Sequence, residues 1–356
     1  MPPADSASAA DREETRSVNP LGIPDWDRTL AGLEGAGFFH SRAWAAVLHD
    51  TYGYRPEYRA EFAAGRLRAL LPMMEVDSWL TGRRGIGLPF TDLAEPLCPD
   101  AGSFQRLHLA TLGLGRTRGW KYAECRGGRH WLPDAPASTS FWRHVLPLHV
   151  GETALLSGFE DSVRRAIRKA ERGGLKIEFA KTPDAMHEFY RLLGMTRRRH
   201  GVPPQPWHFF ANLQRHALAA GHGWIVLARQ AGLPVAGAVF LHFGRHAIYK
   251  FGASDEAHQQ LRANNLVMWR AILHYASEGF VDLDFGRTSL GNEGLRKFKL
   301  GWGAREQQAD YTRYDFRHSG YVTARDEARG WHNRVFQVLP LPLSRLAGSL
   351  LYRHIA

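Results

Sequence analysis

The sequence predicts an α+β fold with a mixed sheet, and three observations support this class. Apolar residues recur at helical spacing from Phe159 to Ala170. Three strand-like runs then follow one another across tight glycine-containing turns, at residues 224–229, 234–243 and 246–251. A helical stretch over residues 256–278 leads into the alternating run from Val281 to Phe285, which predicts a half-buried strand ended by Gly286. Antiparallel strands with helices packed on them are the expected result.

The second half carries clear helix start and stop signals. Ser157 and Glu160 match a capping box, and Gly173-Gly174 end the helix that follows. Thr182-Pro183 begins a second helix, and further elements are expected as a third helix at 207–220 and a final strand at 309–316. This succession of helices, antiparallel meander, helix and strand is the order of an N-acetyltransferase-like (GNAT) domain.

The first half shows a weaker version of the same order. Ser41 caps a predicted helix, and the further elements are strands at 58–62 and 67–76, a helix at 103–117, and strands at 120–125 and 141–150. We therefore predict two tandem GNAT-like subdomains, although no sequence repeat is evident. The expected segments are a disordered tail at 1–20, a first GNAT-like subdomain at 21–150, a second at 151–320 and a C-terminal amphipathic tail at 321–356.

Composition favours an anionic partner and an intracellular location. The chain has 356 residues, and 46 Lys+Arg against 35 Asp+Glu give a net charge of +11, which suits nucleic acid, phosphorylated sugars or an anionic membrane surface. Two cysteines form no disulfide framework, so we expect a reducing cytoplasm. The sequence contains no apolar run of spanning length and no secretory signal at its start.

The C-terminal tail is rich in apolar residues and is broken in the middle by Pro340 and Pro342. Its apolar residues are Trp331, Val335, Phe336, Val338 and Leu339 before the prolines and Leu343, Leu346, Leu350 and Leu351, with Arg345 and Arg353, after them. Two interpretations stay open: the tail packs on the body of the protein, or it lies on the inner face of an anionic membrane.

Common catalytic motifs are absent from the sequence. It contains no phosphate-binding loop and no nucleophile elbow. His242 and His246 straddle a predicted hairpin turn, so we expect no metal site there. What the chain offers instead is fixed positive charge, which suits an anionic substrate or a developing oxyanion. One cluster, with Arg287 and Lys299, follows the strand at Val281; the alternative is a solvated loop.

The helix after Ser157 carries the densest positive charge. Its cations lie off the apolar stripe, at Arg164, Arg165, Arg168 and Lys169. They are candidates for binding phosphate or nucleic acid, although a solvated helix face would look the same.

Several short motifs occur in a fixed order along the chain. They are Arg164 to Ala170, Phe189-Tyr190, residues 196–201, Tyr249 to Ala253, Asn264-Asn265, Asp284 to Arg287 and residues 294–303, with Leu71-Pro72 and residues 88–92 in the first half. In order and spacing they resemble the Fem family, the aminoacyl-tRNA-dependent transferases that build peptidoglycan interpeptide bridges. The resemblance covers residues 35 to 316.

The resemblance implies a precursor groove and a set of site residues. It implies that Lys299 stabilises the oxyanion at the transferred carbonyl, with Phe298 beside it excluding water, and that Arg199 holds an acceptor phosphate. We expect Arg287 to bind phosphate as well, and the groove to be lined by Tyr249, Lys250, Asn264, Asn265 and Asp284. Asn264 and Asn265 could equally be polar packing within a helix. No cofactor is implied, because an aminoacyl ester is already activated.

The donor remains open at this stage. The sequence lacks the long helical arm that some family members carry for tRNA. An acyl-CoA donor has its own difficulty, because Arg262 and Asn264 stand where small residues should let backbone N–H groups approach a pyrophosphate. The favoured hypothesis is therefore a Fem-like transferase that forms an amide on a cell-envelope precursor. Its alternatives are a CoA-dependent N-acyltransferase acting on a sugar or exopolysaccharide, and a non-catalytic GNAT fold that binds RNA or a membrane.

Overall fold

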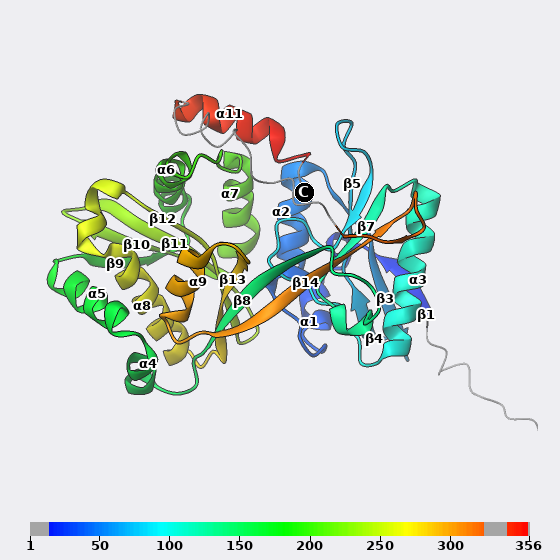
Figure 1. Cartoon of the computed structure of the whole chain (residues 1–356), viewed down its shortest axis with the longest axis horizontal. Helices are drawn as coiled ribbons and strands as arrows, with labels where there is room; N and C mark the ends of the chain where they lie inside the picture. The colour runs from blue at the N-terminus through cyan, green and yellow to red at the C-terminus, as the bar shows by residue number, and fades with distance from the viewer. Residues whose placement is uncertain (1–13, 324–339, 355–356) are drawn as a thin grey trace, which may run out of the picture. The chain divides into compact units, whose positions relative to one another are not determined.

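The computed structural model describes residues 14–323 and 340–354, and residue contacts divide the chain into two compact units (Figure 1). The first unit consists of Met1–Ala45, Gly53–Thr139 and Asp310–Ala324, and the second of Ala46–Tyr52, Ser140–Ala309 and Arg325–Ala356. This division differs from the continuous segments 21–150 and 151–320, because part of the first unit comes from a strand near the end of the chain.

In the first unit, helices pack on two groups of strands. The helices are α1 (Trp26–Leu30), the start of α2 (Arg42–Tyr52) and α3 (Ala101–Arg118). One antiparallel sheet contains β1 (Glu14–Val18), β3 (Tyr58–Ala63) and β4 (Arg66–Leu71). The other contains β2 (Arg55–Pro56), β5 (Met74–Val76), β6 (Arg84–Ile86), β7 (Tyr122–Arg126), the end of β14 (Arg305–Asp315) and β15 (Gly320–Tyr321). Ser41 caps α2 as predicted, since its Oγ accepts from the N–H of Trp44 at 3.2 Å.

Residues 14–18 form strand β1, although the sequence predicted a disordered tail over 1–20. They pair antiparallel with Tyr58–Phe62 of β3. The open edge of β3 offers backbone N–H and C=O groups that pair whatever side chains approach. The Arg16 guanidinium also lies 3.9 Å from the centre of the Phe62 ring. Residues 1–13 lie outside the described part of the chain.

In the second unit, helices cover both faces of a mixed sheet. Its strands are ordered β8 (Thr139–Pro147), β13 (Asp282–Ser289), β12 (His246–Ser254), β11 (Leu233–Phe243), β10 (Gly223–Gln230) and β9 (Lys176–Ala180). Its helices are α4 (Glu152–Gly158), α5 (Asp161–Arg172), α6 (Pro183–Arg199), α7 (Trp207–Leu213), α8 (Ala263–Ser277), α9 (Glu293–Leu300) and α11 (Leu341–Leu351). The predicted meander is present as β10, β11 and β12.

Side-chain alternation along the strands separates the two helical layers. Val226 and Ala228 belong to the core that α5 and α8 share with the sheet. Leu227 and Gly237 face the other way, toward Phe189 of α6, where an added Cβ at Gly237 would lie 3.3 Å from the Phe189 ring. Period-two alternation therefore lets one meander bury both faces.

Strands β12 and β13 are parallel neighbours over only a short length. Their pairing covers His246–Ile248 and Asp282–Asp284, although both strands continue beyond it. In the same region β13 shifts register against β8 between Asp284 and Arg287. Gly286 lies in this bulge with φ 71°, a left-handed conformation that favours glycine. Gly286 is therefore part of strand β13, whereas the sequence pattern had predicted that the strand ends at this residue.

Two helix boundaries also differ from expectation. The predicted helix over 256–278 is interrupted: a 3-10 turn at Glu256–Leu261 is followed by Arg262 at φ 55°, and α8 begins after it. Ser157 does not cap α5. It lies in α4, where its Oγ donates to the Ala154 carbonyl at 2.9 Å. Both sequence patterns had the spacing expected of a helix signal. Tertiary packing nevertheless places the helix boundaries at other residues.

Candidate functional site

A pocket of about 600 Å³ opens on the second unit between α5, the start of α8 and α9. It is lined by Glu160, Ser162, Val163, Arg165, Ala166, Lys169, Arg262, Asn265, Gly294, Lys297, Phe298 and Gly301. We call it the α5–α9 pocket.

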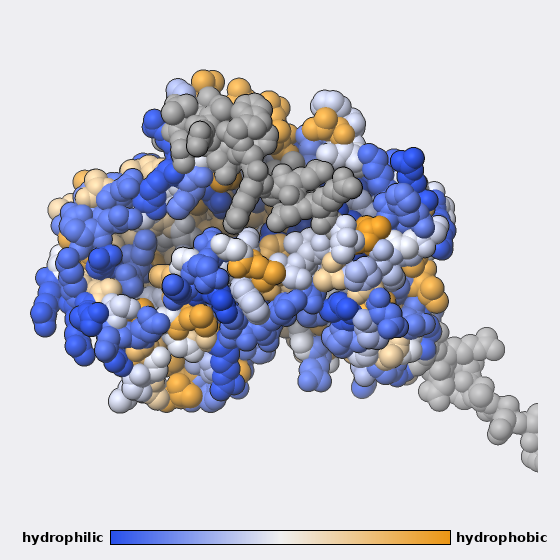
Figure 2. All heavy atoms as spheres, viewed as in Figure 1, coloured by the Kyte–Doolittle hydropathy of each residue, from blue (hydrophilic) through white to orange (hydrophobic). Residues whose placement is uncertain are grey.

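Helix α5 supplies one wall because its apolar stripe is committed to the core. Val163 and Ile167 are buried against the sheet and α8. The remaining faces therefore turn outward, and Arg165 and Lys169, four residues apart, line the pocket together. Figure 2 shows hydrophilic residues gathered over α5.

Helix α8 presents its N-terminus to the same pocket. Arg262 is its N-cap residue in the left-handed conformation, and no side chain caps the helix there. The first N–H groups of a helix carry partial positive charge. Together with the Arg262 guanidinium and the Asn265 amide, they make this wall suited to an anion.

Helix α9 supplies the third wall and is fixed in place by charged contacts. Asn292 Oδ1 caps it by accepting from the Leu295 N–H at 3.1 Å. Arg296 donates to both carboxylate oxygens of Glu306, at 2.7 and 2.8 Å, and this pair holds the pKa of Glu306 below its usual range. His144 also contacts Glu306, at 2.9 Å. Lys297 and Phe298 are thereby turned toward the pocket.

The pocket has an excess of uncompensated positive charge. Arg165, Lys169, Arg262 and Lys297 line it, against the single carboxylate of Glu160. Within residues 14–323 and 340–354, the side chains of these four cations make no hydrogen bond or ion pair. Such a cavity attracts a ligand with several negative charges.

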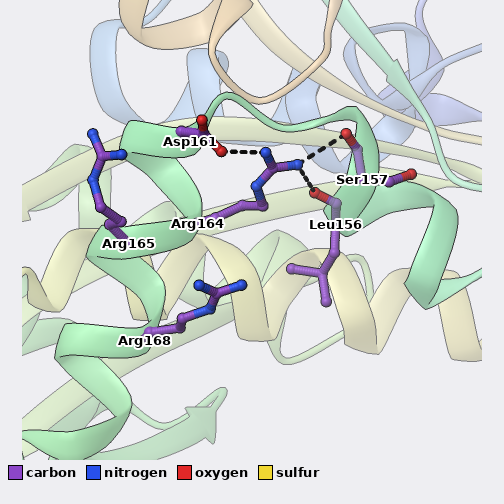
Figure 3. A pocket seen from close by; sticks show the side chains of 6 residues that line it. All are labelled: Leu156, Ser157, Asp161, Arg164, Arg165 and Arg168. Carbon is purple, nitrogen blue, oxygen red and sulfur yellow. Dashed lines mark hydrogen bonds and ion pairs between the residues drawn. The ribbon is translucent and has the colours of Figure 1, made fainter.

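A second, smaller pocket of about 270 Å³ lies against the first turns of α5 (Figure 3). Arg164 is bound within it: it pairs with Asp161 and donates to the carbonyls of Leu156 and Ser157 at 3.3 and 3.1 Å. Arg165 and Arg168 extend beside it without a drawn partner. Because Arg165 lines both pockets, they form one continuous cationic surface.

Lys299 has a different environment from the one expected. Its side chain is 2 % exposed, and Nζ donates to the carbonyls of Gly286 and Arg287 at 2.8 and 3.0 Å. It lines neither pocket. In the described structure it therefore fastens α9 to the bulge of β13.

Two other predicted site residues, Asp284 and Arg287, make contacts between β13 and its neighbour β8. The Asp284 carboxylate accepts from Arg143 Nε at 2.6 Å and from the Gly286 N–H at 2.7 Å. The Arg287 guanidinium lies 4.4 Å from the centre of the Phe141 ring. These contacts stabilise the bulge.

The remaining predicted residues are spread over the second unit. Tyr249 packs on Phe240 and Phe285, and burial raises its pKa to about 12. The other three are Lys250 on β12, Asn264 on the exposed first turn of α8 and Arg199 at the end of α6.

The α5–α9 pocket thus brings together Phe298, Asn265, Arg165 and Lys169 from the predicted set. It adds Arg262 and Lys297, which sequence reasoning had left out of the site. Helical spacing could have found Lys297, because Gly294, Lys297, Phe298 and Gly301 recur every three or four residues on one face of α9.

A family model matches most of the second unit. Residues 157–311 match the family model of the acetyltransferase (GNAT) domain. No curated protein matches the chain significantly.

Solved structures match over nearly the whole chain. FemX superposes with a TM-score of 0.68 at 12 % identity, covering 83 % of this chain and 96 % of its own. L-PGS from Bacillus licheniformis gives 0.55 at 13 % identity, covering 94 % and 98 %. A tandem GNAT protein from the clavulanic acid biosynthesis pathway gives 0.52 at 11 % identity, covering 85 % and 98 %.

At these identities the likeness concerns the fold, and it confirms the predicted α+β fold with tandem GNAT-like subdomains. Residues 157–311 therefore form an acetyltransferase-type (GNAT) domain, and the chain has a Fem-like fold.

Proposed function

We propose that the protein transfers an aminoacyl group from a charged tRNA to an amine of an anionic cell-envelope precursor, forming an amide bond. The observation that carries this proposal is the α5–α9 pocket, where four cations without partners in the described structure surround a cavity in the GNAT domain. A carrier with successive phosphates matches that charge better than a neutral donor does.

The reaction requires positioning and charge more than a strong protein nucleophile. The acceptor amine attacks the ester carbonyl, and the C–N bond forms. The C–O bond to the tRNA ribose then breaks, and the proton that the amine loses passes to the ribose oxygen, which leaves as the hydroxyl. Negative charge develops on the carbonyl oxygen in between. A fixed ammonium in a site shielded from water stabilises that oxyanion.

We assign Lys299 to the reacting carbonyl, with Phe298 excluding water beside it. Two backbone carbonyls already accept from Lys299 Nζ, so contact with an oxyanion would replace one of them. Lys297 adds a second positive charge on the same helix. In the proposal Arg199 and Arg287 bind acceptor phosphate, and the acceptor groove is formed by Tyr249, Lys250, Asn264, Asn265 and Asp284.

A second candidate is an acyl-CoA donor acting on a sugar or exopolysaccharide amine. Arg262 favours it, because the backbone there adopts a left-handed conformation directly before the uncapped N-terminus of α8. Such a helix start binds a pyrophosphate well. A third candidate is a GNAT fold without turnover that binds RNA through α5.

The test is a transfer assay with two donors in parallel. Labelled amino acids on a charged tRNA pool and labelled acetyl-CoA are each incubated with an envelope-precursor extract. We expect label to move from tRNA, and Lys299→Ala to abolish transfer. Arg172→Ala is the matched control, because Arg172 lies at the end of α5 and lines neither pocket. Transfer from acetyl-CoA alone would overturn the tRNA donor, and tight RNA binding with no transfer from either donor would favour the third candidate.

A further inference from the structure

Helix α11 is seated with its polar side inward and its leucines outward. Leu343, Leu346 and Leu350 are 52, 57 and 63 % exposed, whereas Ser344 and Gly348 are buried. The hydrophobic effect acting within this chain alone would favour the opposite rotation. Figure 2 shows hydrophobic residues over α11, at the top of the view.

Specific contacts fix this orientation. An added Cβ at Gly348 would lie 2.1 Å from the Pro204 carbonyl oxygen, so the helix approaches the backbone there more closely than any other side chain permits. The Tyr352 hydroxyl donates to the Pro203 carbonyl at 3.1 Å, and the Arg345 guanidinium lies 4.9 Å from the Tyr190 ring centre. Rotating α11 to bury its leucines would break all three contacts.

The size of the leucine face argues against a second copy as its occupant. A standard protein interface buries about 800 Å² on each partner, which a few half-exposed leucines on an 11-residue helix do not approach. A bilayer surface needs no such area, because an amphipathic helix inserts only its apolar side chains among the lipids.

Charge around α11 favours an anionic bilayer. Arg353 follows the helix and is exposed, and Arg198 is exposed at the end of α6, which packs against α11. The chain as a whole carries +11. Cations beside an inserted apolar face add attraction to acidic headgroups.

We propose that α11 binds the surface of an anionic membrane through Leu343, Leu346 and Leu350. Among the described helices, none combines the length and the apolar composition that crossing a bilayer requires. The proposed binding does not depend on the identity of the acyl donor, so a failed transfer assay would leave it intact.

The test is co-sedimentation of the full chain with vesicles of phosphatidylglycerol and phosphatidylcholine, or of phosphatidylcholine alone. We expect binding to the anionic vesicles that weakens with added salt, and a loss of at least about ten-fold in partition coefficient for Leu346→Asp/Leu350→Asp. Leu346→Ala/Leu350→Ala should lose less, because it adds no charge.

The matched control is Leu109→Asp/Leu233→Asp, which makes the same chemical change at two leucines 62 % and 67 % exposed elsewhere. It should bind nearly as the wild type does, with unchanged circular dichroism in every variant. The proposal is overturned if the α11 variants bind vesicles as the wild type does, or if the partition coefficient of the control falls as much as theirs. It is also overturned if the wild type does not bind anionic vesicles. Sedimentation equilibrium showing a dimer that only the α11 variants dissociate, without vesicle binding, would assign the leucine face to self-association instead.

Discussion

The arginines of the first unit and those of α5 differ in what faces them. In the first unit, Glu124 accepts from Arg126 and Arg313 at 3.0 and 2.7 Å, and Glu61 accepts from Arg106 at 2.8 Å. Both carboxylates are almost completely buried. On α5, Arg165 and Arg168 have no carboxylate within hydrogen-bonding distance in the described structure. Equal residue types therefore serve stability in one region and remain available to a ligand in the other.

The largest expected effect tests whether the buried arginine–carboxylate pairs of the first unit stabilise the fold. Glu124→Ala leaves two arginines without their shared carboxylate, and removing one partner of a buried pair costs about 3–5 kcal/mol of unfolding free energy. Urea unfolding measures it. Glu293→Ala is the matched control: its contact with Arg296, at 3.5 Å, is exposed and should cost no more than about 0.5 kcal/mol. Equal losses in both variants would contradict the structural role of Glu124.

Acid should weaken the fold while leaving the α5 cations charged. Burial lowers the pKa of His108 and of His242 to about 4 from 6.5. As the pH falls, these histidines take up protons in the unfolded chain before they do so in the folded chain. Their contribution to stability is therefore fully present above pH 6.5. That stability is lost toward pH 4, at about 1.4 kcal/mol per pH unit for each.

Thermal unfolding between pH 7 and 4 measures this slope. His242→Gln should flatten it, because glutamine can still donate to the Gly221 carbonyl that His242 contacts at 2.7 Å. Arg165→Ala should leave the slope unchanged, since arginine does not titrate in this range. A slope that is unaltered in His242→Gln would refute the assignment.

Removing two cations from the α5–α9 pocket tests whether the cations without a carboxylate partner bind a ligand. Arg165→Ala/Lys297→Ala should raise KM for the donor by about 10- to 100-fold, as charge-assisted contacts to phosphate are lost. The unfolding free energy should change by no more than about 0.5 kcal/mol. Steady-state kinetics at two salt concentrations measure the first quantity. Arg172→Ala should change neither, and an equal rise in its KM would mean that only overall charge matters.

The smallest effect concerns the backbone at Arg262. Arg262→Gly removes the cost of a left-handed arginine, a gain of at most about 1 kcal/mol, which the added freedom of glycine in the unfolded chain reduces. Donor affinity should fall several-fold, because the pocket loses a cation. Arg262→Lys should keep that affinity without the gain in stability. Stability and affinity that rise together in Arg262→Gly would show that the Arg262 side chain does not contact the donor.

The order of elements could be predicted from the sequence because local patterns determine it. The turns at Ala231-Gly232 and Gly244-Arg245 delimit the strands of the meander, and Thr182 caps α6 as expected, accepting from the Ala185 N–H at 3.3 Å. The apolar stripe of α5 likewise determined which of its residues point outward. These features depend on neighbours only a few residues away, so they were correct without knowledge of the fold.

Only the tertiary structure decided which face each short helix presents. Lys297 and Lys299 are two residues apart, yet one lines the pocket and the other is buried against the β13 bulge, because the Arg296–Glu306 pair fixes the rotation of α9. The break at Arg262 and the outward leucines of α11 depend in the same way on distant partners. The sequence by itself determined the chain's charge, its periodicities and its tandem GNAT-like order. Which cations face a ligand follows from contacts between residues far apart in the chain, and spacing alone does not encode them.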